Sequence, residues 1–211
     1  MLFEYWRSLP PGHLVHPEDR PLLDRHPGQF ELRMPPGQIA GPLKTAPVVA
    51  CFVNPGFDAS DAELAQDPNT RRALLAQLDG EQAYPTQFPA WKSWYVERVG
   101  RVKNPVEDLA RTVAILNFCA YASPNTESLS RALVQSLPSS IAAKRYLHEV
   151  LLPEAGRGQR FVVICRGAWA WGVKRSQESD NVRFAPNPAG GHFGPALSTA
   201  IQQWLSKRSA K

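Results

Sequence analysis

Three polar side chains with useful chemistry each come directly after a short apolar segment of the chain. They are Asn54, Asn117 and Arg166. An asparagine amide offers two N–H donors and a carbonyl acceptor, so it can read the hydrogen-bonding edge of a ligand. The amide is neutral at pH 7, so it can orient a water molecule but cannot take its proton. These residue types indicate a site that binds a polar ligand and positions water.

The apolar segments before these residues are typical of buried strands, because each is short, continuous and bounded by turn residues. We predict strands at residues 48–53, 112–116 and 160–165, and a shorter one at 181–184. Helical patterns are found at residues 71–78, from Pro89 onward, and at 127–137, 140–152 and 195–207.

Strands that alternate with helices predict an α/β domain with a mostly parallel sheet. Ligands of such sheets bind beyond the carboxyl ends of the strands. We therefore expect the polar residues that follow the strands to converge at one edge of the sheet, where they would form a single site.

The first 46 residues differ from the rest of the chain. They are rich in proline and glycine and show no sustained hydrophobic period, which is typical of loops rather than helices. We predict that residues 1–46 form an irregular arm packed on one α/β domain, which comprises residues 47–211.

The composition is that of an ordinary globular protein of 211 residues with a formal net charge of +5. The excess of basic residues favours a polyanionic partner. No apolar run approaches the ~20 residues that a bilayer span requires. The first residues also do not resemble a signal peptide. We expect a cytoplasmic protein that does not contact a membrane.

The three cysteines, Cys51, Cys119 and Cys165, lie far apart and inside or beside apolar runs. Their spacing argues against a disulfide framework, a cysteine-rich zinc site and a four-cysteine iron–sulfur cluster. We expect them to be small core residues. The sequence therefore predicts neither a metal nor a cofactor.

Four segments, in this order, resemble motifs of the uracil-DNA glycosylase superfamily. Residues 53–56, with Asn54-Pro55-Gly56, look like the first motif of its mismatch-specific and single-strand-selective branches. Residues 114–121 are similar to the strand and asparagine that read the flipped pyrimidine. Residues 162–170 stand in place of a strand ending in W-G-A-x-A, and residues 185–191 in place of the H-P-S-P loop. The resemblance covers about residues 48–205 and implies a three-layer α/β/α sandwich with a short, mostly parallel sheet.

The resemblance implies a monofunctional DNA glycosylase, which hydrolyses the N-glycosidic bond of a flipped base and leaves an abasic site. Asn117 would read the pyrimidine, and Asn54 would orient the attacking water. Gly56 stands where the main branch has a tyrosine that blocks C5 of the pyrimidine. The substrate would be uracil or a 5-modified pyrimidine. Modified bases of phage DNA would be the most heavily substituted substrates that such an open pocket admits.

Other positions of the resemblance imply contacts with the base and with DNA. Ala185 replaces the motif histidine that binds the leaving base, so that role is either vacant or taken by His192. Phe57, together with Phe88 or Trp91, would stack on the base. The residues expected to contact DNA are Arg166, Asn187, Gly190 and Gly191 at the phosphates, and Phe193 or Ala189 as a wedge. The partner would be single- or double-stranded DNA, bound by a monomer.

Two other readings remain open. The missing motif histidine favours a catalytically inactive nucleic-acid-binding or adaptor domain on the same fold. Alternatively, Cys165 could be a nucleophile at a strand end, although no histidine lies near it in the sequence. Nucleotide hydrolases and dehydrogenases are disfavoured, because the chain has neither a G-x-x-x-x-G-K-[ST] nor a G-x-G-x-x-G motif.

Overall fold

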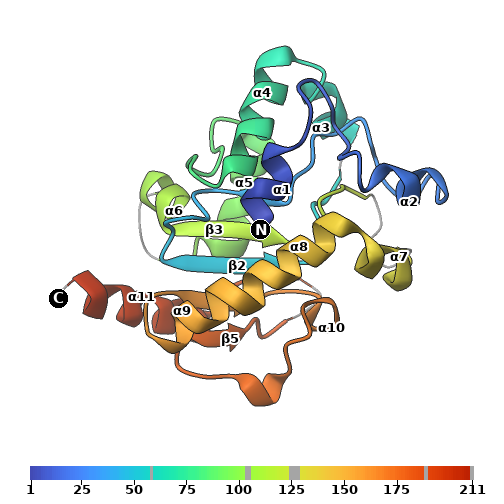
Figure 1. Ribbon diagram of the computed structural model, residues 1–211. Helices are drawn as coiled ribbons and strands as arrows, with labels where there is room; N and C mark the ends of the chain where they lie inside the picture. The colour runs from blue at the N-terminus through green and yellow to red at the C-terminus, as the bar shows by residue number, and fades with distance from the viewer. Residues whose placement is uncertain (58, 103–105, 124–128, 188–189, 210–211) are drawn as a thin grey trace.

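A five-stranded sheet forms the centre of the protein (Figure 1). The structure is a computed structural model that describes residues 1–211 except 58, 103–105, 124–128, 188–189 and 210–211. The strands are β1 (Ile39–Ala40), β2 (Val48–Phe52), β3 (Val113–Asn117), β4 (Phe161–Ile164) and β5 (Val182–Phe184), in the order β1-β3-β2-β4-β5. β1 runs antiparallel to β3, and all other pairs are parallel.

Helices flank the sheet, because both of its faces are apolar. Successive side chains of a strand point to opposite faces, and in β2 this divides Val49 and Cys51 from Val48, Ala50 and Phe52. The first set packs in a core with residues of α1, α8 and α9, and the second in a core with residues of α5, α6 and α11. The predicted α/β fold with a mostly parallel sheet is confirmed.

The helices are α1 (Leu2–Arg7), α2 (Arg20–Asp24), α3 (Ala59–Leu64), α4 (Pro68–Ala76), α5 (Pro89–Val99), α6 (Val106–Thr112), α7 (Arg131–Ser136), α8 (Pro138–Tyr146), α9 (Leu152–Gly156), α10 (Ala168–Trp171) and α11 (Pro195–Ser209). A π-helical turn at Leu147–Leu151 joins α8 to α9. Pro138 separates α7 from α8, as the sequence predicts, because a proline fits the first turn of a helix but not its interior. No helix in the described part of the chain is long and apolar enough to cross a membrane.

Residues 1–46, which the sequence predicts as an irregular arm, include three short regular elements, α1, α2 and β1, and otherwise consist of turns and loops. Leu2 and Trp6 are one helical turn apart and both enter the core. Trp6 Nε1 donates a hydrogen bond to the buried Gln38 at 2.7 Å. The N-terminal segment therefore supplies the edge strand and part of the core of the same domain.

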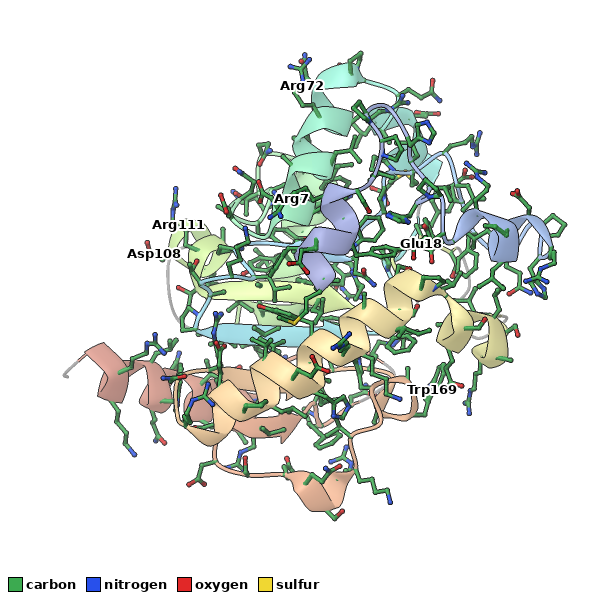
Figure 2. The ribbon with its side chains drawn as sticks, viewed as in Figure 1. Arg7, Glu18, Arg72, Asp108, Arg111 and Trp169 are labelled. Atoms are coloured by element: carbon green, nitrogen blue, oxygen red, sulfur yellow. The ribbon has the colours of Figure 1, made fainter. Side chains whose placement is uncertain are left out.

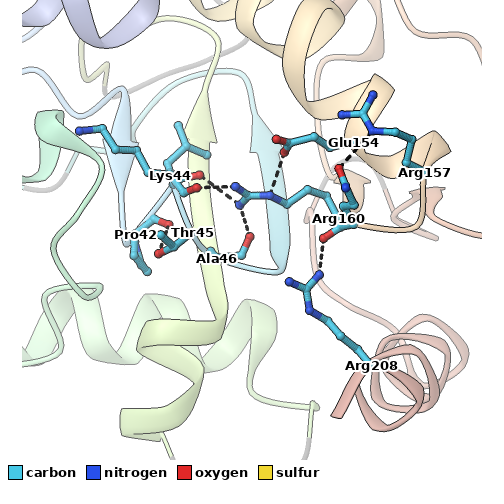
Figure 3. Close-up of polar contacts among 10 residues, drawn as sticks. Pro42, Lys44, Thr45, Ala46, Glu154, Arg157, Arg160 and Arg208 are labelled. Atoms are coloured by element: carbon cyan, nitrogen blue, oxygen red, sulfur yellow. Dashed lines mark hydrogen bonds and ion pairs between the residues drawn. The ribbon is translucent and has the colours of Figure 1, made fainter. Parts of the chain in front are cut away.

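Arg160 connects the segment before β2 to helix α9 (Figure 3). Its guanidinium donates to the carbonyl oxygens of Leu43, Lys44 and Ala46. Its Nε forms an ion pair with Glu154 of α9 at 2.9 Å. Three hydrogen bonds from one arginine thereby hold residues 43–46 in the geometry that leads into the central strand.

Candidate functional site

A pocket of about 580 Å³ lies at the carboxyl ends of β2 and β3. Its wall is formed by residues 34–37, 39 and 40, by residues 55–57 after β2, by the end of β3 and by side chains of α3, α4 and α5. Its volume is within the roughly 300–1,000 Å³ of small-molecule sites. The pocket therefore occupies the position that the parallel sheet predicts for a ligand.

Asn117, the last residue of β3, lines this pocket with only 6% of its surface exposed. Its Nδ2 donates to the carbonyl oxygen of Gly37 at 2.7 Å. This contact decides the orientation of the amide, because the reverse orientation would place two carbonyl oxygens together. No other residue in the described part of the chain binds its Oδ1. One N–H and one carbonyl oxygen therefore remain for a ligand.

Asn54 lies at the same edge of the sheet but is held by its own loop. Phe52 is paired with Asn117 in register, so Asn54 follows the neighbouring strand end. Its Nδ2 donates to Ser123 Oγ at 3.1 Å and to the carbonyl oxygen of Pro55 at 2.9 Å. Pro55, Gly56 and Phe57 line the pocket, whereas Asn54 is not among the described lining residues. Asn54 lies next to the pocket wall rather than in it.

Gly56 leaves its part of the wall open, since a Cβ built there meets no atom within 4 Å. The structure thus has empty space at the position that a side chain in place of Gly56 would occupy. Phe57 lines the pocket beside it. Phe88, by contrast, caps the start of α5 and packs edge-on against Trp91 at 5.0 Å without lining the pocket. Trp91, the alternative to Phe88, does line the pocket, and Trp94 lines it as well.

Two charged residues that the sequence did not single out also line the pocket: Asp61 of α3 and Arg98 of α5. Trp91 Nε1 donates to Asp61 Oδ1 at 3.0 Å. The Arg98 guanidinium lies over the ring of Trp94, at 4.5 Å from its centroid. A sequence signal existed only for α5, where positions 91, 94 and 98 fall on one helical face. No local sequence pattern indicates that α3 approaches α5.

The loop after β5 lies beside the pocket. His192 Nδ1 is 3.2 Å from the carbonyl oxygen of Glu97, and His192 does not line the pocket. Asn187 Oδ1 accepts a bond from the backbone N–H of Gly190 at 3.4 Å. Gly191 adopts a φ of +67°, where a Cβ would come within 2.6 Å of Phe52. Both the backbone angle and the close approach to Phe52 favour glycine at position 191.

The proposed wedge at Phe193 is wrong, because this side chain is 0% exposed and packs in the core with α5 and α11. The other wedge candidate, Ala189, lies outside the described residues.

An exposed basic and aromatic surface lies beyond the end of β4. The ring of Trp169 in α10 is 37% exposed, and Arg131 of α7 lies over it at 4.8 Å. Figure 2 shows Trp169 at the edge of the molecule. Arg166, three residues before Trp169, is half-buried with its backbone bound to Cys51. Arginine beside an exposed tryptophan is chemistry that suits phosphates and unstacked bases.

Burial argues against the reading in which Cys165 is a nucleophile. All three cysteines are buried and free. Burial raises the pKa of the Cys165 thiol well above its ordinary value of 9, so the thiol stays protonated and unreactive. Among the described residues, no group of three histidine, cysteine or acidic side chains is placed to hold a metal ion.

Comparison with known proteins yields no relative: no protein-family model, no curated protein and no solved structure matches this chain. A functional assignment therefore depends on the geometry of the pocket and on the motif residues around it.

Proposed function

We propose that this protein is a monofunctional DNA glycosylase, which hydrolyses the N-glycosidic bond of a flipped uracil or 5-modified pyrimidine and leaves an abasic site. The observation that carries this proposal is the orientation of Asn117. With one N–H bound to Gly37, its amide presents one donor beside one acceptor in an apolar pocket. This pair matches the neighbouring acceptor and donor on the pairing edge of a pyrimidine.

The walls of the pocket suit a flipped base. A base without its stacking partners needs aromatic surface to replace them, and Phe57, Trp91 and Trp94 supply it. Gly56 leaves space where a side chain would exclude a 5-substituent. The pocket therefore favours pyrimidines that are modified at C5, including the modified bases of phage DNA.

The arrangement of the motifs supports the finer fold assignment as well. The segment 53–56 follows β2, and the segments 114–121 and 162–170 contain the carboxyl ends of the adjacent parallel strands β3 and β4, so the three ends meet at one edge. Helices flank both faces of this sheet. Both features agree with the three-layer sandwich of the uracil-DNA glycosylase superfamily, which we propose for this chain.

Catalysis would depend on charge stabilisation more than on proton abstraction. As the C1′–N1 bond breaks, its electron pair goes to the base, and water adds hydroxyl to C1′ and supplies a proton to the base. The amide of Asn54, held by Ser123 and Pro55, would orient that water but cannot take its proton. Asn117 would stabilise charge on the departing base. We therefore expect slow turnover.

The experiment is a panel of oligonucleotides and naturally modified phage DNAs, each assayed for released base by mass spectrometry and for alkali-labile sites. Release that is lost in Asn54→Ala and Asn117→Ala, but retained in the exposed control Asn69→Ala, supports a glycosylase. DNA binding without release from any substrate would instead identify an inactive binding domain. The position of His192 outside the pocket gives that second reading its support.

A further inference from the structure

Arg98 places a positive charge in the wall of a mostly apolar pocket. Its side chain is 19% exposed, and it lines the pocket next to Trp94, with its guanidinium 4.5 Å from the centroid of the Trp94 ring. The guanidinium is a permanent cation, and electrostatic interactions are stronger in a partly buried site than in water. The pocket therefore holds a fixed positive charge to which neither Asn54 nor Asn117 gives a function.

The contacts of Arg98 leave donors for a ligand. Its Nη1 donates to Glu97 Oε2 at 2.9 Å and to the carbonyl oxygen of Trp94 at 3.4 Å. The Glu97 side chain is 61% exposed, and ion pairs of exposed carboxylates are weak. Within the described part of the chain, no residue accepts a hydrogen bond from Nε or Nη2 of Arg98. Because a guanidinium has five N–H donors, Arg98 can bind a ligand and keep these contacts.

The end of α5 that carries Arg98 is fixed against the loop after β5. The backbone N–H of Phe193 donates to the carbonyl oxygen of Arg98 at 2.8 Å, and His192 Nδ1 lies 3.2 Å from the carbonyl oxygen of Glu97. The sequence predicts that this loop binds the leaving base, but Ala185 has no polar side-chain group and His192 does not line the pocket. Arg98 lies beside the same loop and does line the pocket.

A base held by Asn117 lies close to this part of α5. Ile115 and Asn117 share one face of β3, because side chains two positions apart point the same way. Helix α5 packs on that face, and Ile115, Asn117, Trp94 and Arg98 all line the pocket. The pocket is therefore bounded by the end of β3 on one side and by the face of α5 that carries the guanidinium on another.

Loss of the base creates a negative charge that Arg98 is suited to bind. When the C1′–N1 bond breaks, its electron pair goes to N1 and is shared with O2, the carbonyl oxygen next to N1. The amide of Asn117 has one free N–H and one free oxygen, so it reads two neighbouring groups of the base. A base that is read at N3 and at its 4-substituent leaves O2 for another donor, and a charged donor forms the stronger bond to an anionic oxygen.

We propose that Arg98 is a catalytic residue, which binds O2 of the departing pyrimidine and stabilises its negative charge as the C1′–N1 bond breaks. Arg98 keeps its own protons throughout. The electron pair of the broken bond goes to the base, the water held by Asn54 adds its hydroxyl to C1′, and the remaining proton of that water neutralises the base. This assignment rests on the proposed glycosylase function and adds a catalytic group to the same pocket.

The first test measures single-turnover base release at saturating protein, on the duplex that the wild-type protein cleaves fastest. Loss of one preorganised donor costs about 10²–10³ in rate, so we expect Arg98→Gln to be at least ~100-fold slower. Arg98→Lys keeps the charge and should recover at least ~10-fold of that loss. Lys92→Gln removes an exposed cation from the same helix and should keep the wild-type rate. Thermal melting confirms that each variant is folded.

The second test detects charge on the leaving base, which a structural role of Arg98 would not affect. It uses two pairs of bases with similar size and different acidity: uracil with 5-fluorouracil, and thymine with 5-bromouracil. The halogen withdraws electrons and stabilises the departing anion without help from the protein. We therefore expect the ratio of halogenated to parent rate to rise at least ~10-fold in Arg98→Gln and to stay at its wild-type value in Lys92→Gln.

The outcomes separate this inference from the function on which it rests. A folded Arg98→Gln variant with the wild-type rate, or with an equal loss of rate on both members of each pair, overturns the catalytic role and leaves the glycosylase standing. Weaker DNA binding with an unchanged rate at saturating protein also overturns that role. If the wild-type protein releases no base from these duplexes or from modified phage DNAs, the glycosylase is overturned, and the role of Arg98 with it.

Discussion

The carbonyl oxygen of Gly37 accepts a hydrogen bond from Asn117 Nδ2 at 2.7 Å, across a separation of 80 residues in the chain. The α-carbon of Gly37 also lies against the first motif, because a Cβ built on it would come within 2.8 Å of Pro55 Cγ. One residue of the N-terminal segment therefore orients the amide of Asn117 and contacts the loop after β2. The segment before β2 is part of the site.

Gly37→Ala should disturb the site more than the fold. The added methyl group would collide with the rigid ring of Pro55, so either the loop or the Gly37 carbonyl must move away from Asn117. We expect base release to fall at least ~10-fold, since misplacement by about 1 Å can cost a factor of 10². Gly156→Ala is the matched control, because its Cβ meets nothing within 4 Å. Equal single-turnover rates in the two variants would argue against a positioning role for Gly37.

Asn117→Asp should abolish most of the activity while keeping the size of the side chain. The carboxylate cannot donate to Gly37, so an oxygen would face a carbonyl oxygen where the N–H now lies. Loss of one preorganised donor costs about 10²–10³ in rate in comparable sites. Single-turnover base release measures the effect, with Asn69→Asp on the exposed face of α4 as the control. A folded Asn117→Asp variant with the wild-type rate would contradict the assignment.

Arg166→Ala should weaken DNA binding in a salt-dependent manner. If Arg166 contacts one phosphate, its removal should reduce the slope of log K against log salt by about 0.9 on duplex DNA. Fluorescence anisotropy with labelled DNA at several salt concentrations measures this slope. Arg72 lies at the opposite end of the molecule from Trp169 (Figure 2), so Arg72→Ala should leave the slope unchanged. Identical slopes for the two variants would place the DNA surface elsewhere.

Alkaline pH should destabilise the protein before its tyrosines ionise in the folded state. Burial raises the pKa of all five tyrosines above the ordinary value of 10, and that of Tyr146 to about 12. The unfolded chain therefore releases protons first, so stability is complete below pH 10 and falls as the pH rises above it. Urea unfolding in steps from neutral pH to above pH 10 measures the decrease. Tyrosinate absorbance that develops near pH 10 in the folded protein would refute this.

Arg160→Ala should reduce stability. Arg160 is 8% exposed and its guanidinium binds three carbonyl oxygens and Glu154, as Figure 3 shows. Hydrogen bonds to charged groups contribute about 1.5–3 kcal/mol each, so we expect the free energy of unfolding to fall by at least about that amount. Urea titration measures it, with the exposed Arg157→Ala as the control. A change of less than about 0.5 kcal/mol, typical of surface positions, would show that the network does not stabilise the fold.

The sequence by itself determined the parallel strands of the sheet and the edge at which the candidate site lies. The strands β2, β3 and β4 arise from continuous apolar runs, which are local patterns and therefore readable. Asn117 follows from the same reasoning, because a polar residue at the end of a buried parallel strand must emerge at the ligand-binding edge.

Only the tertiary structure decided which residues line the pocket. Ile39–Ala40 is too short to show a period, so neither β1 nor the contact of Gly37 with Asn117 could be foreseen. Asp61 enters the pocket because α3 approaches Trp91 of α5, and Phe193 is withdrawn from the surface because its loop turns it into the core. These outcomes depend on contacts between segments that are distant in the chain. A hydrophobic pattern indicates which face of an element is buried, but it does not indicate the partner against which that face packs.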